Sequence, residues 1–154
     1  MFGFNRKRET IYMPVDGNVI ELKEVSDPVF AQKMMGDGFA IIPTNDPVYS
    51  PVNGNVVSIF PTKHAIMLKT TNGVDVLIHI GIDTVTLEGE GFDSRIKEGQ
   101  NVTIGDCLTL VDREYLKMKG KNDTIIIVFP EHDGDIQVEK TGKYPQGEII
   151  GSIK

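Results

Sequence analysis

The stretch His64-Ala-Ile-Met-Leu-Lys-Thr-Thr-Asn-Gly-Val-Asp-Val-Leu-Ile-His-Ile80 decides the fold, because two alternating runs flank one strong turn signal. Alternation of apolar and polar residues over strand-length runs predicts half-buried β-strands. An Asn-Gly pair between such runs favours a β-hairpin, since both residues tolerate positive φ. The stretch therefore predicts antiparallel strands over 64–69 and 74–80.

The same kind of pattern recurs along the whole chain. Further strand-length runs cover 18–23, 55–60, 103–104, 107–111 and 124–129, and 16 glycines punctuate the sequence. Helical spacing appears only briefly, over 28–35 and over 112–119, where Asp112 is a suitable N-cap. The sequence predicts an all-β fold, an antiparallel β-sandwich or barrel with short peripheral helices.

Length and charge limit the classes of protein to which this chain can belong. Its 154 residues suffice for one sizeable core, and we expect a flexible N-terminal tail over 1–12 followed by a single domain over 13–154. The net charge is −6, and Arg6-Lys7-Arg8 is the one basic cluster in the sequence. This acidic balance, without an extended run of basic residues, argues against nucleic-acid binding. No apolar run approaches the roughly 20 residues of a membrane-spanning helix.

The single cysteine, Cys107, cannot form an internal disulfide, and no signal-peptide pattern opens the sequence. We therefore expect a cytoplasmic protein. Phe2 and Phe4 beside the basic cluster allow at most a weak contact of the tail with an anionic membrane.

Two of the three histidines lie in the predicted hairpin. With a two-residue loop, or with a four-residue loop, His64 and His79 share one face of the ladder. Residues directly opposed on such a face have Cβ atoms about 4.5–5.5 Å apart, and diagonal ones about 7–8 Å. The same registers would place three apolar residues on that face, Ile66, Leu68 and Leu77. Only an odd-length loop would separate the histidines.

A pair of convergent imidazoles is compatible with three chemistries: phosphoryl transfer through a phosphohistidine, metal coordination, and general acid–base catalysis. Zinc normally takes three or four protein ligands, and neither a His-x-His nor a Cys-x-x-Cys motif is present. A metal site built by this chain alone is therefore disfavoured.

The motifs around these histidines resemble those of a known family. They are Thr62-Lys-His-Ala65, Val74-Asp-Val-Leu-Ile-His-Ile-Gly-Ile-Asp-Thr-Val85, Leu87-Glu-Gly-Glu-Gly-Phe92, Asp27-Pro-Val-Phe30, Met35-Gly-Asp-Gly-Phe-Ala-Ile41 and Glu98-Gly-Gln-Asn-Val-Thr-Ile-Gly-Asp106. In order and spacing the chain resembles, from about Pro14 to Gly151, the glucose-family IIA component of the bacterial phosphoenolpyruvate-dependent sugar phosphotransferase system.

The resemblance implies a role for each residue of the central motif. His79 matches the histidine that accepts a phosphoryl group on Nε2 from the phosphocarrier protein HPr and yields it to a cysteine of a IIB domain. His64 matches the partner histidine needed for onward transfer, and Thr62 the hydroxyl that hydrogen-bonds it. Gly81 matches the residue whose carbonyl receives the Nδ1 proton of the active histidine.

The resemblance also implies one docking face for both protein partners, an apolar depression with an acidic rim. The matching apolar positions are Val29, Phe30, Phe60, Leu77 and Val85, and the rim positions are Asp27 and Asp83. Met67 and Leu77 depart from the family pattern, because many members carry phenylalanine there. The shape of the depression and the choice of partner are therefore open.

Two other functions remain open. A biotin- or lipoyl-type carrier domain would present its attachment lysine on a tight hairpin, whereas the nearest candidates, Lys117 and Lys119, lie in a charged, helix-like stretch. A regulatory binding module would hold zinc between His64 and His79, completed by a carboxylate of a partner. For phosphoryl transfer we expect a monomer that requires no cofactor.

Overall fold

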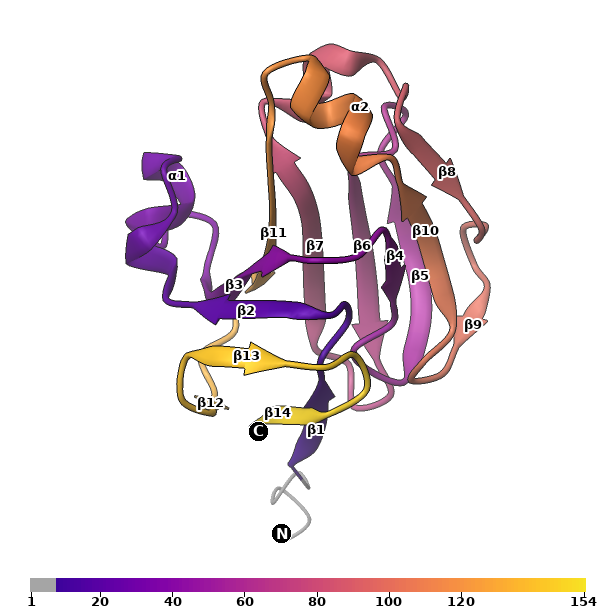
Figure 1. The fold of residues 1–154 in the computed structure, drawn as a ribbon. Helices are drawn as coiled ribbons and strands as arrows, with labels where there is room; N and C mark the ends of the chain where they lie inside the picture. The colour runs from indigo at the N-terminus through magenta and orange to yellow at the C-terminus, as the bar shows by residue number, and fades with distance from the viewer. Residues whose placement is uncertain (1–7) are drawn as a thin grey trace, which may run out of the picture.

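An eight-stranded antiparallel sheet forms the body of the protein, in a computed structural model that describes residues 8–154 (Figure 1). In spatial order its strands are β13 (Gly142–Tyr144), β2 (Gly17–Ile20), β3 (Asp37–Pro43), β11 (Asn122–Phe129), β7 (Asp75–Ile82), β6 (Ala65–Thr70), β5 (Gly54–Ile59) and β9 (Asn101–Val102). The two longest strands, β11 and β7, pair with each other in the middle of the sheet, and β6 pairs with the other edge of β7. They supply the rigid base on which the site is built.

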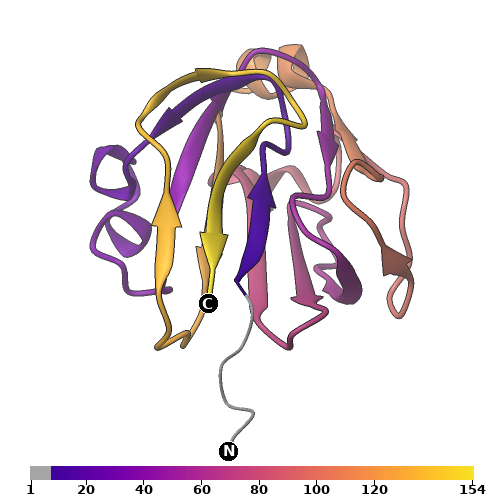
Figure 2. The ribbon, with the colours of Figure 1, turned by 90° about the horizontal axis from the view of Figure 1, so that it is seen from below.

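Two three-stranded sheets accompany the large one. The first consists of β1 (Glu9–Tyr12), β14 (Ile149–Ile153) and β12 (Ile136–Val138), which lie side by side in Figure 2. The second consists of β4 (Pro47–Tyr49), β10 (Cys107–Val111) and β8 (Phe92–Ser94). The predicted antiparallel all-β architecture is confirmed.

Short helices decorate the sheets within the described residues. They are α1 (Pro28–Ala31) and α2 (Arg113–Met118), with two 3-10 turns, η1 (Leu22–Glu24) and η2 (Thr84–Leu87). The Asp112 side chain accepts a hydrogen bond from the backbone of Tyr115, as its assignment as an N-cap predicts. Both predicted helices exist, each shorter than its sequence pattern. Across the described range, none of the helices is long and apolar enough to cross a membrane.

The N-terminal boundary differs from the sequence interpretation. Residues 9–12, expected in the flexible tail, form β1, which pairs with β14 from the other end of the chain. This pairing joins residues more than a hundred positions apart, so no local pattern reveals it. Residues 1–7, with the aromatic and most of the basic side chains considered for membrane contact, lie outside the described residues.

The main hydrophobic core lies between the large sheet and the two small ones. It takes Ile66 and Leu68 from β6, and Ile78 and Ile80 from β7, all at most 1% exposed. The small sheets contribute further apolar side chains, including those of Ile11, Val48, Leu108, Val111, Ile150 and Ile153. This side of the large sheet is closed.

A second, smaller core lies on the opposite face of the large sheet. Its sheet residues are Ala40, Ala65, Leu77, Ile126 and Val128, which alternate along their strands with main-core residues. The residues that cover them are Leu22, Val25 and Phe30, from η1, α1 and the chain between them. In Figure 1 these helices stand at one side of the sheet. The face is therefore covered only in part.

Candidate functional site

The turn of the β6–β7 hairpin encloses an odd number of residues, so the predicted even-length loop is wrong. The chain closes between Thr70 and Val74, whose carbonyl accepts the Thr70 N–H at 2.8 Å, and Ala65 pairs with His79. Gly73 has a φ of +87°, but Asn72 does not adopt positive φ, so a two-residue Asn-Gly turn does not form.

A contact with the N-terminal strand accompanies this turn. The Glu9 carboxylate accepts hydrogen bonds from the Thr70 hydroxyl at 2.5 Å and from the Asn72 N–H at 3.3 Å. The Thr70 hydroxyl in turn accepts the Val74 N–H at 3.0 Å. A carboxylate 61 residues away from Thr70 thus helps to hold the odd loop.

The odd register changes which side chains accompany His79. Ile66 and Leu68, expected on the histidine face, point into the main core instead. The neighbours of His79 on its own face are Ala65 of β6 and Ile126 of β11, directly opposite it on either side, and Leu77 of the second core. The prediction for Ile66 and Leu68 is wrong because shifting an antiparallel register by one residue inverts a whole strand.

The two histidines nevertheless meet, by a different route from the one predicted. Regular alternation would place His64 and Ala65 on opposite faces, and hence His64 and His79 on opposite faces. However, His64 precedes β6 and follows Lys63, which has a left-handed φ of 61°. The chain leaves extended geometry at this point, and the two ring centroids lie 4.9 Å apart at an interplanar angle of 83°.

Four rings form a row through the site. Phe30 of α1 lies 4.9 Å from the His79 ring, and Phe60, which follows β5, lies 5.6 Å from the His64 ring. The side chain of His64 is buried, at 4% exposed, whereas His79 is half-buried. The row runs from the second core to an exposed aromatic residue, since Phe60 is 42% exposed.

Thr62 holds the ring of His64, as the resemblance implied. Its hydroxyl lies 2.7 Å from His64 Nδ1, a normal hydrogen-bond distance. When the hydroxyl donates, Nδ1 is the acceptor, and the ring proton of neutral His64 resides on Nε2. The second imidazole can then donate a hydrogen bond from that nitrogen.

Burial keeps both imidazoles neutral near pH 7. It lowers the pKa of His79 to about 4, helped by the nearby His64, while the Gly81 carbonyl, Asp27 and Asp83 act in the opposite direction. Burial also lowers the pKa of His64. A neutral imidazole has a free lone pair on one ring nitrogen, so His79 can act as a nucleophile without a separate base.

The contact expected between Gly81 and His79 is incomplete. In the part of the chain that the structure describes, Nδ1 of His79 is the one buried side-chain nitrogen or oxygen without a hydrogen-bond partner. The Gly81 carbonyl is the backbone hydrogen-bond acceptor that acts to raise the pKa of the ring, although its contact with Nδ1 falls outside normal hydrogen-bond geometry. Gly81 has a φ of +80°, and a Cβ there would lie 2.3 Å from Thr84 Cγ2, so only glycine fits.

The residues assigned to the docking face divide into two groups. Val29, Phe60 and Val85 are 41%, 42% and 50% exposed, and are accessible to a partner. Phe30 and Leu77 are 5% and 3% exposed and belong to the second core, so they support the site from beneath. This burial corrects the expectation that all five form the accessible surface.

The charges of the two rim carboxylates, Asp27 and Asp83, oppose in small part the lowering of the His79 pKa by burial. Asp27 also caps α1, since its Oδ1 accepts the Val29 N–H at 2.9 Å, and it thereby fixes the helix that carries Phe30. Asp83 is exposed and adopts a left-handed φ of 59° immediately before η2. The structure thus brings both expected acidic residues to the histidine.

Sequence reasoning missed two residues of the site, Ala65 and Thr84. Ala65 lies opposite His79, and its small side chain leaves room for the ring. Thr84 is 0% exposed, and its hydroxyl donates to the Ile80 carbonyl at 2.5 Å. The only signal for Thr84 was its place two residues after Ile82 in the central motif, which does not reveal that the hydroxyl turns back toward β7.

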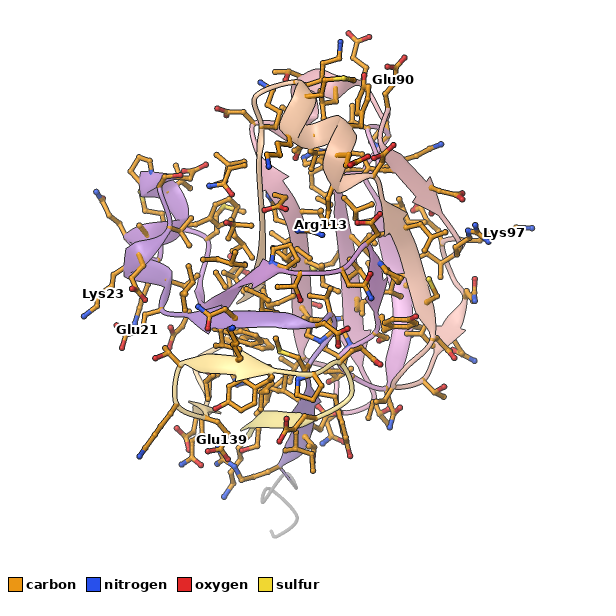
Figure 3. All side chains as sticks on the ribbon, viewed as in Figure 1. Glu21, Lys23, Glu90, Lys97, Arg113 and Glu139 are labelled. Atoms are coloured by element: carbon orange, nitrogen blue, oxygen red, sulfur yellow. The ribbon has the colours of Figure 1, made fainter. Side chains whose placement is uncertain are left out.

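Other possible sites do not coincide with the histidines. Among residues 8–154, no group of three or more histidine, cysteine, aspartate or glutamate side chains is arranged to hold a metal ion. Lys117 lies within α2 and Lys119 caps its end, so neither stands on the hairpin that a biotin or lipoyl carrier requires. A groove of about 840 Å³ is lined in part by Glu21, Lys23 and Glu139, which Figure 3 labels at the left of the molecule, and neither His64 nor His79 lines it.

Comparison with known proteins gives consistent matches. The family described as phosphoenolpyruvate-dependent sugar phosphotransferase system, EIIA 1, matches residues 9–134. A PTS system glucose-specific EIIA component of Halalkalibacterium halodurans is 44% identical over 142 residues, which cover 86% of this chain and 82% of that protein. A solved structure, glucose permease IIA from Mycoplasma capricolum, is 40% identical, covers 100% of both chains and has a TM-score of 0.87.

A longer relative shares the same region. The PTS system glucose-specific EIICBA component of Streptococcus pneumoniae is 48% identical over 153 residues, which cover 98% of this chain. The chain spans about a fifth of that relative, 21% of its length. On the family match and the high-coverage relatives, the chain belongs to the EIIA 1 family of the phosphoenolpyruvate-dependent sugar phosphotransferase system.

Proposed function

We propose that this chain is a phosphocarrier of the sugar phosphotransferase system that accepts a phosphoryl group on His79 Nε2 from phospho-HPr. It then passes the group to a cysteine of a IIB domain. The observation that carries this proposal is the pair of imidazoles, one buried and one half-buried, with ring centroids 4.9 Å apart, beside a partly covered apolar face. Family membership supports the same role.

The proposed transfer consists of two displacements at phosphorus. In the first, the Nε2 lone pair of His79 forms a bond to phosphorus while the bond to the donor imidazole breaks, and its electron pair returns to the donor nitrogen. In the second, the thiolate of the IIB cysteine attacks, and the P–N bond electrons return to Nε2. The proton on His79 Nδ1 stays in place throughout. Such transfer depends mainly on alignment and charge stabilisation.

His64 supplies the charge stabilisation in this proposal. With Thr62 donating to its Nδ1, His64 carries a proton on Nε2 that can be donated to a phosphoryl oxygen. A preorganised donor of this kind is most effective where charge develops during transfer. We assign His64 to onward delivery, because the resemblance of its motif to the glucose-family IIA component implies that role for the partner histidine.

The partly covered face is the proposed docking surface for HPr and for the IIB domain in turn. Val29, Phe60 and Val85 offer accessible apolar contacts, and Asp27 and Asp83 lie at the rim. Acidic groups at a rim accelerate the encounter with a basic partner, and the effect weakens with salt. The name EIICBA of the longer relative supports a IIB partner for this chain. We propose that the chain acts as a monomer.

The test is incubation of the purified chain with phosphoenolpyruvate, enzyme I and HPr, followed by mapping of the phosphorylated residue. We expect one acid-labile phosphoryl group, on His79. His79→Gln should abolish labelling. The matched control is His132→Gln, because His132 bonds the Lys154 carbonyl at 2.9 Å, away from the row of rings. Full labelling of the His79 variant, or loss of labelling in the His132 variant, would contradict the assignment.

A zinc ion shared with a partner is a second proposal for the same pair of histidines. The neutral rings of His64 and His79 are suitable ligands, but they are two, and structural zinc takes four. The remaining ligands would have to come from the partner, for example a carboxylate. Titration with zinc alone should then show weak binding, and chelation should dissociate the complex with that partner while leaving phosphorylation by HPr intact.

A further inference from the structure

The side chain of Thr84 lies against the strand end that follows His79. Its hydroxyl donates a hydrogen bond to the Ile80 carbonyl at 2.5 Å. This bond connects the two residues on either side of the turn that contains Gly81. Its methyl group packs against Gly81, because a Cβ built on that glycine would lie 2.3 Å from Thr84 Cγ2. Thr84 is itself 0% exposed. The Thr84 hydroxyl thus holds the peptide that enters Gly81, and its methyl group lies against Gly81 itself, from which the next peptide, with the Gly81 carbonyl, continues.

The turn around Thr84 adopts backbone conformations that need support. Gly81 has a φ of +80°, which glycine adopts without steric cost, whereas Asp83 has a φ of 59°, which is unfavourable for a residue with a side chain. A second hydroxyl, that of Thr86, donates to the Asp83 carbonyl at 2.8 Å. Strain of this kind persists only where surrounding contacts enforce it. The two threonines provide such contacts.

This turn sets the surroundings of the buried nitrogen of His79. Nδ1 has no hydrogen-bond partner among residues 8–154, and the Gly81 carbonyl is the backbone group that acts on the ring. A proton on Nδ1 is attracted by that carbonyl, whereas a lone pair on Nδ1 would be repelled by it. The orientation of the peptide between Gly81 and Ile82, which carries this carbonyl, therefore decides which ring nitrogen keeps the proton.

We infer that Thr84 is a positioning residue: by holding the Ile80 carbonyl and the Gly81 backbone, it keeps the proton of His79 on Nδ1 and leaves Nε2 as the nucleophile. The consequence for transfer rests on the proposed function. The tautomer itself is a property of the unphosphorylated protein and is measured without any partner.

The test compares Thr84→Val, which removes the hydroxyl at nearly constant shape, with Thr84→Ser, which retains it. Thr109→Val is the matched control, since Thr109 is 1% exposed and its hydroxyl donates to the Asp93 carbonyl at 3.2 Å, in another sheet. The ¹⁵N shifts of the His79 ring report the tautomer, and labelling from phospho-HPr reports the rate of acceptance.

We expect the wild type, Thr84→Ser and Thr109→Val to hold the proton on Nδ1. Thr84→Val should show a mixture of tautomers and accept the phosphoryl group about tenfold more slowly. If Thr84→Val does not fold, Thr84→Ala is measured in the same way.

Unchanged ring shifts in a folded variant without the hydroxyl would overturn the inference, and so would the same mixture in Thr84→Ser or Thr109→Val. Failure of the proposed function appears separately, as a wild-type chain that shows the Nδ1 tautomer but takes no phosphoryl group on His79.

Discussion

The two faces of the large sheet differ in how completely they are covered. On one face, Ile78 and Ile80 are fully enclosed between the large sheet and the two small ones. On the other face, Leu77 is covered by η1 and α1, but His79, two residues further along the same strand, is half-buried. Its ring lies against the buried His64, which in turn lies beside the exposed Phe60. The site lies where the apolar cover of the second core is incomplete.

This difference explains how an ordinary strand can present a reactive group. β7 is held rigidly by β6 and β11, so the position of His79 requires no mobile loop. The incomplete apolar cover removes water from the ring on one side and lowers its pKa to about 4, while the other side stays accessible. A closed core would stabilise the fold equally well but would leave no nucleophile in reach.

The largest expected effect concerns the open face. His64→Gln should leave acceptance from phospho-HPr within a fewfold of the wild type, but slow delivery to a IIB cysteine by at least about a hundredfold, because it removes the imidazole that faces His79. The two half-reactions are measured separately with labelled phosphoryl donors. Equal losses in both half-reactions would mean that His64 does not distinguish the steps.

The second prediction contrasts the two faces directly. Ile78→Ala should destabilise the protein by about 2–5 kcal/mol, since Ile78 is 0% exposed in the closed core. Phe60→Ala, at a position 42% exposed, should cost less than about 1 kcal/mol but raise the KM for phospho-HPr. Urea unfolding and initial rates provide the two measurements. The contrast fails if Phe60→Ala destabilises as strongly as Ile78→Ala.

The third prediction concerns pH. The pKa of His79 is depressed in the folded state to about 4, whereas an unfolded histidine titrates near 6.5. Above about pH 6.5 both states are neutral at this residue; below it, the unfolded state binds the proton first, so stability falls until about pH 4. Between pH 7.5 and pH 5 this residue should cost about 2 kcal/mol.

Urea unfolding of the wild type and of His79→Gln at those two pH values isolates this contribution. The variant should lose less stability on acidification. If the variant shows the same pH dependence of stability as the wild type, the pKa of His79 is not lowered in the folded protein. The rate of acceptance should vary little between pH 6.5 and pH 8, where the ring is already neutral.

The smallest expected effect is that of Thr62→Val, which removes the hydroxyl 2.7 Å from His64 Nδ1. The loss of one hydrogen bond, about 1 kcal/mol, should slow delivery about fivefold and leave acceptance nearly unchanged. Thr71→Val, at an exposed turn position at the far end of the hairpin, serves as the control. An effect larger than that of His64→Gln would contradict the supporting role of Thr62.

Much of the molecule could be predicted from local pattern. The alternating runs that became β5, β6, β7, β10 and β11 were identified within a few residues, and Asp112 was identified as an N-cap. Short edge strands such as β4 and β8 were missed, because three residues carry too little periodicity. The β1–β14 pair escaped for another reason, since it joins the two ends of the chain.

The sequence by itself determined the strand-forming pattern, the motif that carries His64, His79 and Gly81, and through that motif the family. Only the tertiary structure decided how these residues face one another. The Glu9 carboxylate, 61 residues from Thr70 in the chain, accepts a hydrogen bond from the odd-length loop. The left-handed backbone of Lys63 lets the His64 ring lie on the same face as His79. Alternation specifies that a strand has two faces, but which face is closed and which stays open depends on packing between distant segments.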